Sequence, residues 1–212
     1  MNLDLLGKTA IVCGSTQGIG KATALQLAKM GANIVLVARN EVKLASVKDE
    51  LDISKGQKHN HIKADFNFPA ELKLSVEEFI KEHGPAHILV NNTGGPPGGQ
   101  AIAAKTDEYT SAFNMHLISN QSLAQALVEG MKSEGYGRII NVISTSVKQP
   151  LNGLGVSNTI RGAVASWSKT LANELGEFNI TVNNVLPGAT NTVRLQSIIE
   201  TKASKTGRSI ED

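Results

Sequence analysis

Short apolar runs alternate with longer amphipathic segments along almost the whole chain. The runs are rich in β-branched residues, which indicates buried strands. They lie at residues 9–13, 33–38, 61–64, 87–91, 138–143 and 181–186. The segments between them have the spacing of amphipathic helices: 18–30, 41–52, 69–83, 106–134 and 157–178. This alternation predicts an α/β fold with a parallel sheet and helices on both faces, and the doubly wound Rossmann topology is the leading choice.

A chain of 212 residues is enough for one compact domain with a substantial core. We expect that domain to span residues 1–192. Residues 193–212 form a polar tail of uncertain structure, and no closing strand follows them. The pattern leaves open whether the domain ends there or whether the sequence is a piece of a longer chain.

The composition narrows the class of protein. Aromatic residues make up only 4% of the chain, so the core is expected to be aliphatic, as buried parallel strands allow. The net charge of +2 is spread without long runs, which argues against a nucleic-acid groove or a membrane patch. A single cysteine, Cys13, excludes an internal disulfide, and no apolar run approaches the roughly 18 residues of a bilayer span. We therefore expect a cytoplasmic protein, and the histidines show no metal-site spacing.

The first strand runs directly into "GSTQGIGK", a glycine-rich turn that opens a helix. A dinucleotide pyrophosphate binds at such a helix N-terminus, and a β-carbon would block both the tight turn and the close approach of the backbone. The sequence therefore predicts a nucleotide site that includes Gly14, Ser15, Gly18, Ile19 and Gly20. The alternative is an ordinary tight turn between a strand and a helix.

The G-x-x-x-G-x-G spacing of this turn resembles that of the short-chain dehydrogenase/reductase family. Three later segments are similar to family motifs in the same order: "NNTGG" (91–95), "EGYGRIINVIS" (134–144) and "LANELGEFNITVNNVLPG" (171–188). The resemblance covers about residues 3–192. It implies an oxidoreductase that transfers hydride between a nicotinamide cofactor and a small carbonyl or alcohol substrate. The family's final helix and strand, which often help to form dimers and tetramers, have no counterpart here, although a homo-oligomer is still expected.

One branch of the family is a closer match than the rest. The loop "GGPPGG" (94–99) and the segment "SN…R" (157–161) resemble the branch that is similar to β-ketoacyl carrier-protein reductases. This resemblance supports membership of a subgroup of functional enzymes, but it does not identify a substrate.

The end of the second strand predicts the cofactor. An acidic residue there would repel a 2′-phosphate, but the chain has Arg39 and no carboxylate until Glu41. The guanidinium of Arg39 offers donors suited to phosphate, so we expect NADP(H), with NAD(H) as the alternative. Arg39 could instead be a solvated residue at the start of the next helix. Asp65 resembles the family position that meets the adenine amino group, although it could simply cap a helix. The resemblance adds further cofactor contacts at Phe66, Asn91, Gly94, Pro187, Gly188 and Thr192.

The resemblance also implies four catalytic positions, which the family fills with asparagine, serine, tyrosine and lysine. Ser144 matches the serine, which orients the carbonyl. Ser157 stands where the proton-transferring tyrosine belongs, and Arg161 stands in place of the lysine that assists it. His116 occupies the position of the asparagine that supports a water relay. Three of the four positions have therefore changed.

The missing tyrosine matters because acidity differs greatly between the two hydroxyls. A phenol titrates near ~10 and an alkyl hydroxyl near ~16, a gap of roughly 8 kcal/mol. If half of this free-energy difference applied in the transition state, proton transfer by Ser157 would be roughly a thousandfold slower than by tyrosine. Two hypotheses follow. The protein is an enzyme in which His116 or Ser157 assists proton transfer, or it is a nucleotide-binding regulatory or partner protein without activity. His116 could also serve only as a hydrogen-bonding residue within its helix.

Overall fold

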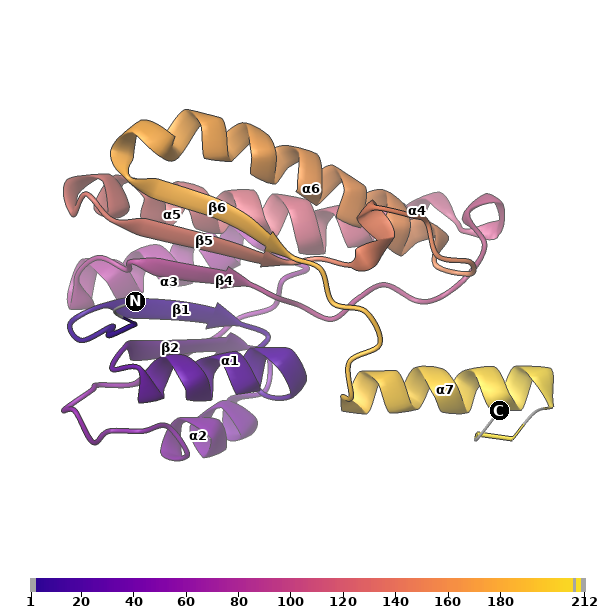
Figure 1. Ribbon diagram of the computed structural model, residues 1–212, viewed down its shortest axis with the longest axis horizontal. Coiled ribbons are helices and arrows are strands. Elements are labelled where there is room, and N and C mark those ends of the chain that lie inside the picture. Colours follow the sequence, from indigo (N-terminus) through magenta and orange to yellow (C-terminus); the bar gives the residue numbers. More distant parts are fainter. Residues whose placement is uncertain (1–2, 208, 211–212) are drawn as a thin grey trace.

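The computed structural model describes residues 3–207 and 209–210 and contains one sheet of six parallel strands (Figure 1). The strand order is β3-β2-β1-β4-β5-β6, which reverses direction between β1 and β4. The predicted doubly wound fold is therefore confirmed, and each predicted strand limit lies within one residue of the observed one. The strands are β1 (Thr9–Cys13), β2 (Asn33–Ala38), β3 (Asn60–Lys63), β4 (Ile88–Asn91), β5 (Gly137–Val142) and β6 (Ile180–Val185).

Helices cover both faces of this sheet, as expected. Alternate residues of β1 contribute to two separate cores because successive side chains of a strand point to opposite faces. Ile11 packs in the core beneath α3 (Pro69–His83), α5 (Ser119–Ser133) and α6 (Gly155–Leu175). Val12 packs in the core beneath α1 (Gly18–Lys29) and α2 (Glu41–Asp49). The two cores hold the strands so that their carboxyl ends meet at one edge.

The long helix predicted over 106–134 is interrupted, which corrects that prediction. Helix α4 (Thr106–Phe113) is followed by a π-helical turn, η2 (Asn114–Ile118), and then by α5. A π turn inserts an extra residue and rotates the side chains around it, and such turns are frequent at functional sites. Here the turn contains His116, whose side chain is buried.

The tail beyond residue 192 contains a helix. Helix α7 (Val193–Thr206) begins at Thr192, whose Oγ1 accepts a hydrogen bond from Leu195 N, and ends before Gly207, which has a left-handed φ of 66°. Figure 1 shows α7 beyond the carboxyl ends of the strands, apart from the two helical layers. Within the described ranges, no helix is both long and apolar enough to cross a membrane.

Candidate active site

The glycine-rich turn after β1 lies at the point where the strand order reverses. Gly14 and Gly18 have φ values of 58° and 55°, which other residues rarely adopt. A β-carbon on Gly14 would lie 2.5 Å from Asn92 O, and one on Gly20 would overlap Gly14 O. Asn92 Nδ2 donates to the carbonyls of Cys13 (3.2 Å) and Gly14 (3.3 Å), so the end of β4 holds the turn in place. Asn92 was missed by the sequence prediction, although it belongs to the "NNTGG" motif.

A cleft of about 520 Å³ opens at this turn. Five of the predicted cofactor residues line it: Gly14, Arg39, Asp65, Phe66 and Gly94. Eight lining residues were not predicted: Thr16, Gln17, Ala38, Asn40, Lys43, Thr93, Gly95 and Met115. Ligands of open α/β sheets bind at such a switch point, outside the carboxyl ends of the strands.

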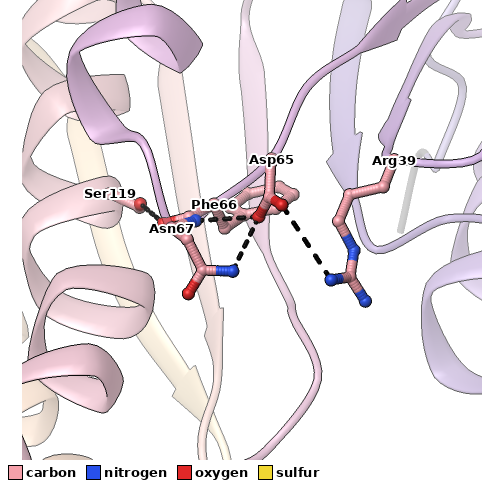
Figure 2. Close-up of polar contacts among 5 residues, drawn as sticks. All are labelled: Arg39, Asp65, Phe66, Asn67 and Ser119. Carbon is pink, nitrogen blue, oxygen red and sulfur yellow. Dashed lines mark hydrogen bonds and ion pairs between the residues drawn. The ribbon is translucent and has the colours of Figure 1, made fainter. Parts of the chain in front are cut away.

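One end of the cleft is held by Asp65 and its neighbours (Figure 2). The Asp65 Oδ1 atom accepts hydrogen bonds from both the backbone nitrogen and the Nδ2 of Asn67, each at 2.9 Å. Its Oδ2 atom lies 3.9 Å from Arg39 Nη1. The carbonyl of Phe66 accepts a buried hydrogen bond of 2.8 Å from Ser119 Oγ, which ties this loop to α5. The carboxylate of Asp65 is therefore fixed, whereas the Arg39 side chain is 72% exposed and can reorient.

A second cation lies at the same end. Lys43 occupies the first turn of α2, and Asn40 caps this helix by accepting a hydrogen bond of 2.9 Å from Lys43 N. Glu41, the nearest carboxylate on α2, forms an ion pair of 3.5 Å with Lys63. Lys43, Arg39 and the start of a helix together favour an anionic group in the cleft.

The other predicted cofactor residues lie around the same strand ends. They are Ser15, Gly18, Ile19, Gly20, Asn91, Pro187, Gly188 and Thr192. The segment after β6 connects two of these regions, because a β-carbon on Gly18 would lie 3.3 Å from Thr192 Cγ2. At its other end, Pro187 O accepts a hydrogen bond of 3.2 Å from Thr145 N, in the loop after β5.

Four buried side-chain oxygens near this edge have no hydrogen-bond partner within the described part of the chain. They are Ser15 Oγ, Asn91 Oδ1, Ser146 Oγ and Asn158 Oδ1. Folded proteins leave few buried polar atoms unsatisfied, and those that remain often mark a site completed by water or a ligand. Together with the cleft beside the glycine-rich turn, these unsatisfied oxygens fit a bound dinucleotide and substrate at this edge.

The reaction half of the site consists of the four predicted catalytic residues, one of which is Ser144. It lies two residues beyond β5 and caps the 3₁₀ turn η3 (Thr145–Val147). Its Oγ accepts a hydrogen bond of 3.1 Å from Ser146 N. With one lone pair used in this way, the hydroxyl proton remains available to donate to another oxygen.

Ser157 and Arg161 lie one turn apart on α6, and both are half-buried. The Nη1 atom of Arg161 donates to Val142 O at 3.0 Å, so the guanidinium lies at the end of β5, two residues before Ser144. Helix α6 also packs against η3 and η2, the turns that contain or adjoin Ser144 and His116. The four predicted catalytic residues therefore lie on α6 and at two turns that α6 contacts.

His116 is only 1% exposed, and it lines a separate pocket of about 290 Å³. Asp107 and Glu108 line the same pocket, together with the two prolines of the "GGPPGG" loop. This pocket and the cofactor cleft share Gly95 and Met115. His116 thus lies beside the cleft, in a pocket that the proline loop also lines.

Neither tyrosine replaces the missing phenol on α6. Tyr109 lies on α4, and its hydroxyl donates to Ala101 O at 3.4 Å. Tyr136 precedes β5, at the opposite edge of the sheet, where its ring lies between Lys8 and Arg138. Cys13 is no substitute nucleophile, because burial raises the pKa of its thiol to about 12. Among the described residues, no group of three histidine, cysteine or carboxylate side chains could hold a metal ion.

Comparisons with known proteins agree with this geometry. The family model for short chain dehydrogenase matches residues 8–203. An uncharacterized oxidoreductase, YvaG, from Bacillus subtilis is 33% identical over 203 residues, which cover 94% of this chain and 74% of that protein. The 3-oxoacyl-[acyl-carrier-protein] reductase FabG from Vibrio cholerae is 33% identical over 191 residues, or 89% of this chain and 75% of that one.

A solved structure of L-sorbose reductase from Gluconobacter frateurii, complexed with NADPH and L-sorbose, has the same fold. Its TM-score is 0.91 at 32% identity, and the match covers 100% of this chain and 80% of that one. The chain therefore belongs to the short-chain dehydrogenase family. The predicted resemblance, including that to the ketoacyl-reductase-like branch, is confirmed, as is the class of hydride-transferring oxidoreductase. An inactive nucleotide-binding protein is not favoured.

Proposed function

We propose that this protein is an NADP(H)-dependent oxidoreductase that reduces a small-molecule carbonyl or oxidises the corresponding alcohol. The proposal rests on one observation: the cleft beside the glycine-rich turn, at the switch point, is lined at one end by Arg39 and Lys43. A carboxylate at the end of β2 would select NAD(H), whereas two cations suit the 2′-phosphate of NADP(H). The L-sorbose reductase relative, which is complexed with NADPH, supports the same choice.

The cleft offers a contact for each part of the cofactor. The turn at Gly14 and Gly20 would hold the pyrophosphate, because the backbone there can be approached closely. Asp65, fixed by Asn67, would accept a hydrogen bond from the adenine amino group. Arg39 and Lys43 would bind the 2′-phosphate. When bound, NADP(H) supplies the hydride, so the chain must supply only orientation and a proton.

Ser144 would orient the substrate. Its Oγ already accepts a hydrogen bond from Ser146 N, so its proton can be donated to the substrate oxygen. A donor that is positioned before the reaction stabilises the negative charge that develops on that oxygen during hydride transfer.

Arg161 and Ser157 would replace lysine and tyrosine only in part. A guanidinium remains protonated, so Arg161 can place positive charge at the end of β5 but cannot carry a proton. Ser157 can form hydrogen bonds on the same face of α6, although its hydroxyl is a weak acid. A further proton donor is therefore needed.

His116 is our candidate for that donor. An imidazole can exchange protons near neutral pH, and that of His116 lies in a turn against which α6 packs. Its pocket of about 290 Å³ is large enough to hold water, with which the imidazole could exchange a proton.

The test is fluorescence titration with NADPH, followed by turnover with a panel of ketones and β-ketoacyl thioesters. We expect binding with turnover, and we expect His116→Ala to lower the turnover number at least about tenfold without weakening NADPH binding. Binding without turnover on any substrate would contradict the proposed function. Unchanged turnover in His116→Ala would remove only His116 from the mechanism.

Three further expectations belong to the same proposal. The nucleotide-binding and catalytic domain spans residues 1–192, and residues 193–212 are an appendage to it. The protein acts in the cytoplasm, as the use of a single, buried cysteine supports. It assembles as a homo-dimer or tetramer, which sedimentation analysis would test.

A further inference from the structure

Two loops at the carboxyl edge of the sheet are joined by a short parallel bridge. One is the loop between β4 and α4, and the other precedes α6. Gly99 N donates to Gly153 O at 2.7 Å, and Gly155 N donates to Gly99 O at 2.9 Å, so Gly99 and Leu154 are bridge partners. The proline-rich loop is therefore attached to the first residues of the helix that contains Ser157.

The bridge depends on a glycine at the start of α6. A β-carbon on Gly155 would overlap the Cα and nitrogen of Ala101, so any larger residue would push the two loops apart. A β-carbon on Gly99 would meet nothing within 4 Å, and its φ lies outside the left-handed region. Gly99 therefore matters for its backbone hydrogen bonds, whereas Gly155 matters because a side chain there would clash with Ala101.

The same bridge caps α6. The first N–H groups of a helix lack partners within the helix and are usually satisfied by a polar side chain at the N-cap. The N-cap of α6 is Leu154, which provides no side-chain hydrogen bond. The carbonyl of Gly99 accepts from Gly155 N instead. A carbonyl from a distant loop therefore stabilises the first turn of α6.

Ser157 lies in that first turn, and Arg161 lies in the next one. Arg161 is held independently, because its side chain donates to Val142 O. Apolar packing begins at Val156, which lies with Ile160 and Ala112 in a small core between α6 and α4. Loosening of the bridge would thus shift the first turn and Ser157 with it, whereas Arg161 stays bonded to β5.

We propose that the bridge between Gly99 and Leu154 positions Ser157 for the reaction, with Gly99 and Gly155 as positioning residues. This inference rests on the proposed function, because it assigns Ser157 a role at the substrate. It adds that the "GGPPGG" loop acts by capping a helix and contributes no side chain to the chemistry.

The first test compares Gly99→Pro with Gly99→Ala in the full chain. Proline removes the N–H that donates to Gly153, whereas alanine keeps it and fits the open space. We expect Gly99→Pro to lower kcat about 10- to 100-fold and to leave the NADPH Kd within about twofold, because a small displacement of a reacting group is costly. We expect Gly99→Ala to behave as the wild type.

Equal kcat values for the two variants would overturn the positioning role. A Gly99→Pro variant that loses NADPH affinity by the same factor as kcat would overturn it too, since that result indicates general damage. No turnover by the wild type would instead overturn the proposed function, and the positioning role with it. The two failures are therefore distinguishable.

A second test does not depend on activity. Hydrogen exchange of the amides at 155–158 should be about tenfold faster in Gly99→Pro than in Gly99→Ala, because loss of the Gly99–Gly153 hydrogen bond loosens the bridge that holds the Gly99 carbonyl against Gly155 N. Gly155→Ala should show the same acceleration, whereas Gly162→Ala, in the open interior of the same helix, should not. Equal exchange in all four variants would show that the bridge does not cap α6 and would overturn the inference.

Discussion

The nucleotide half and the reaction half of the site differ in how closely they follow the family pattern. In the nucleotide half, the glycines that the pattern requires are present, and Gly14 and Gly20 lie where a side chain would collide with the backbone. In the reaction half, only Ser144 keeps its family identity. We expect cofactor binding, and with it hydride transfer, to depend on the first half and proton transfer to depend on the second. Because the two halves differ in this way, cofactor binding and turnover should be measured separately.

The two arginines show the same contrast. Arg39 lines one end of the cleft, is mostly exposed and lies 3.9 Å from Asp65, so it can reorient toward a phosphate at little cost. Arg161 is half-buried and donates to a backbone carbonyl at 3.0 Å, so its position is set by the fold. The first is suited to ligand selection, and the second is suited to maintaining a fixed positive charge.

The largest effect on cofactor binding should come from adding a side chain to the glycine-rich turn of the nucleotide half. Gly20→Ala places a methyl group against Gly14 O, which neither backbone segment can easily avoid. We expect NADPH affinity to fall about a hundredfold, in line with the cost of overpacking a rigid site. Fluorescence titration would measure this, with Gly162→Ala as the control for a helical glycine that has open space. Wild-type affinity in Gly20→Ala would mean that the turn does not hold the pyrophosphate.

The next effect concerns cofactor selection. Arg39→Ala and Lys43→Ala should each weaken NADPH binding about 10- to 100-fold, the usual value of a charge-assisted hydrogen bond. NADH lacks the 2′-phosphate, so its affinity should change little and serves as the internal control. Competition titrations with both cofactors would give the ratio. If NADH weakened equally, these cations would be shaping the cleft and would not be reading the phosphate.

A smaller effect should follow from restoring the phenol. Ser157→Tyr supplies a hydroxyl that is far more acidic than that of serine, and we expect turnover to rise about tenfold. Ser157→Phe is the matched control because it adds the same ring without the hydroxyl. Initial rates at saturating NADPH would compare them. Equal rates in the two variants would indicate that the phenol does not reach the substrate and that the reaction half uses another geometry.

The smallest effect lies outside both halves, at the amino ends of the strands. Burial, and then the charge of Lys8, lower the pKa of His87 below 6.5, while Glu134 opposes the shift. The neutral ring accepts a hydrogen bond of 3.1 Å from Thr9 N. The unfolded chain binds this proton more readily, so stability is lost as the pH falls below about 6.5. We therefore expect Tm to fall as the pH is lowered through this range.

Thermal unfolding between pH 7.5 and about 5 would check this expectation. His87→Gln keeps an acceptor for Thr9 N but does not titrate, so its Tm should depend less on pH over that range. An identical pH dependence in the variant would assign the loss to other groups.

Much of the fold and of the nucleotide half could be predicted because the signals are local. The β-branched runs gave strand limits within one residue, and the glycine spacing located the tight turn between β1 and α1. Arg39 and Asp65, which line the cleft, could be singled out because each lies within two residues of the end of a strand. Lys43 and Asn92 were missed because their roles depend on contacts across the cleft, although Lys43 lies only four residues after Arg39.

The reaction half shows where sequence patterns stop being informative. The periodicity of 106–134 is that of one helix, but the structure contains a π turn that buries His116. Whether a turn widens depends on how α4, α5 and α6 pack, which no local pattern records. The same is true of Gly155, whose importance comes from Ala101, more than fifty residues earlier in the chain.

The sequence by itself determined the order of strands and helices, the glycine turn, the basic residue at the end of β2 and the presence of serine and arginine at positions 157 and 161 of α6. These features are encoded in residue identity and in short-range periodicity. Only the tertiary structure decided which residues share the cleft, that His116 is buried beside it, and that the "GGPPGG" loop caps α6. Those outcomes depend on contacts between segments far apart in the chain, which are fixed only when the two cores are packed.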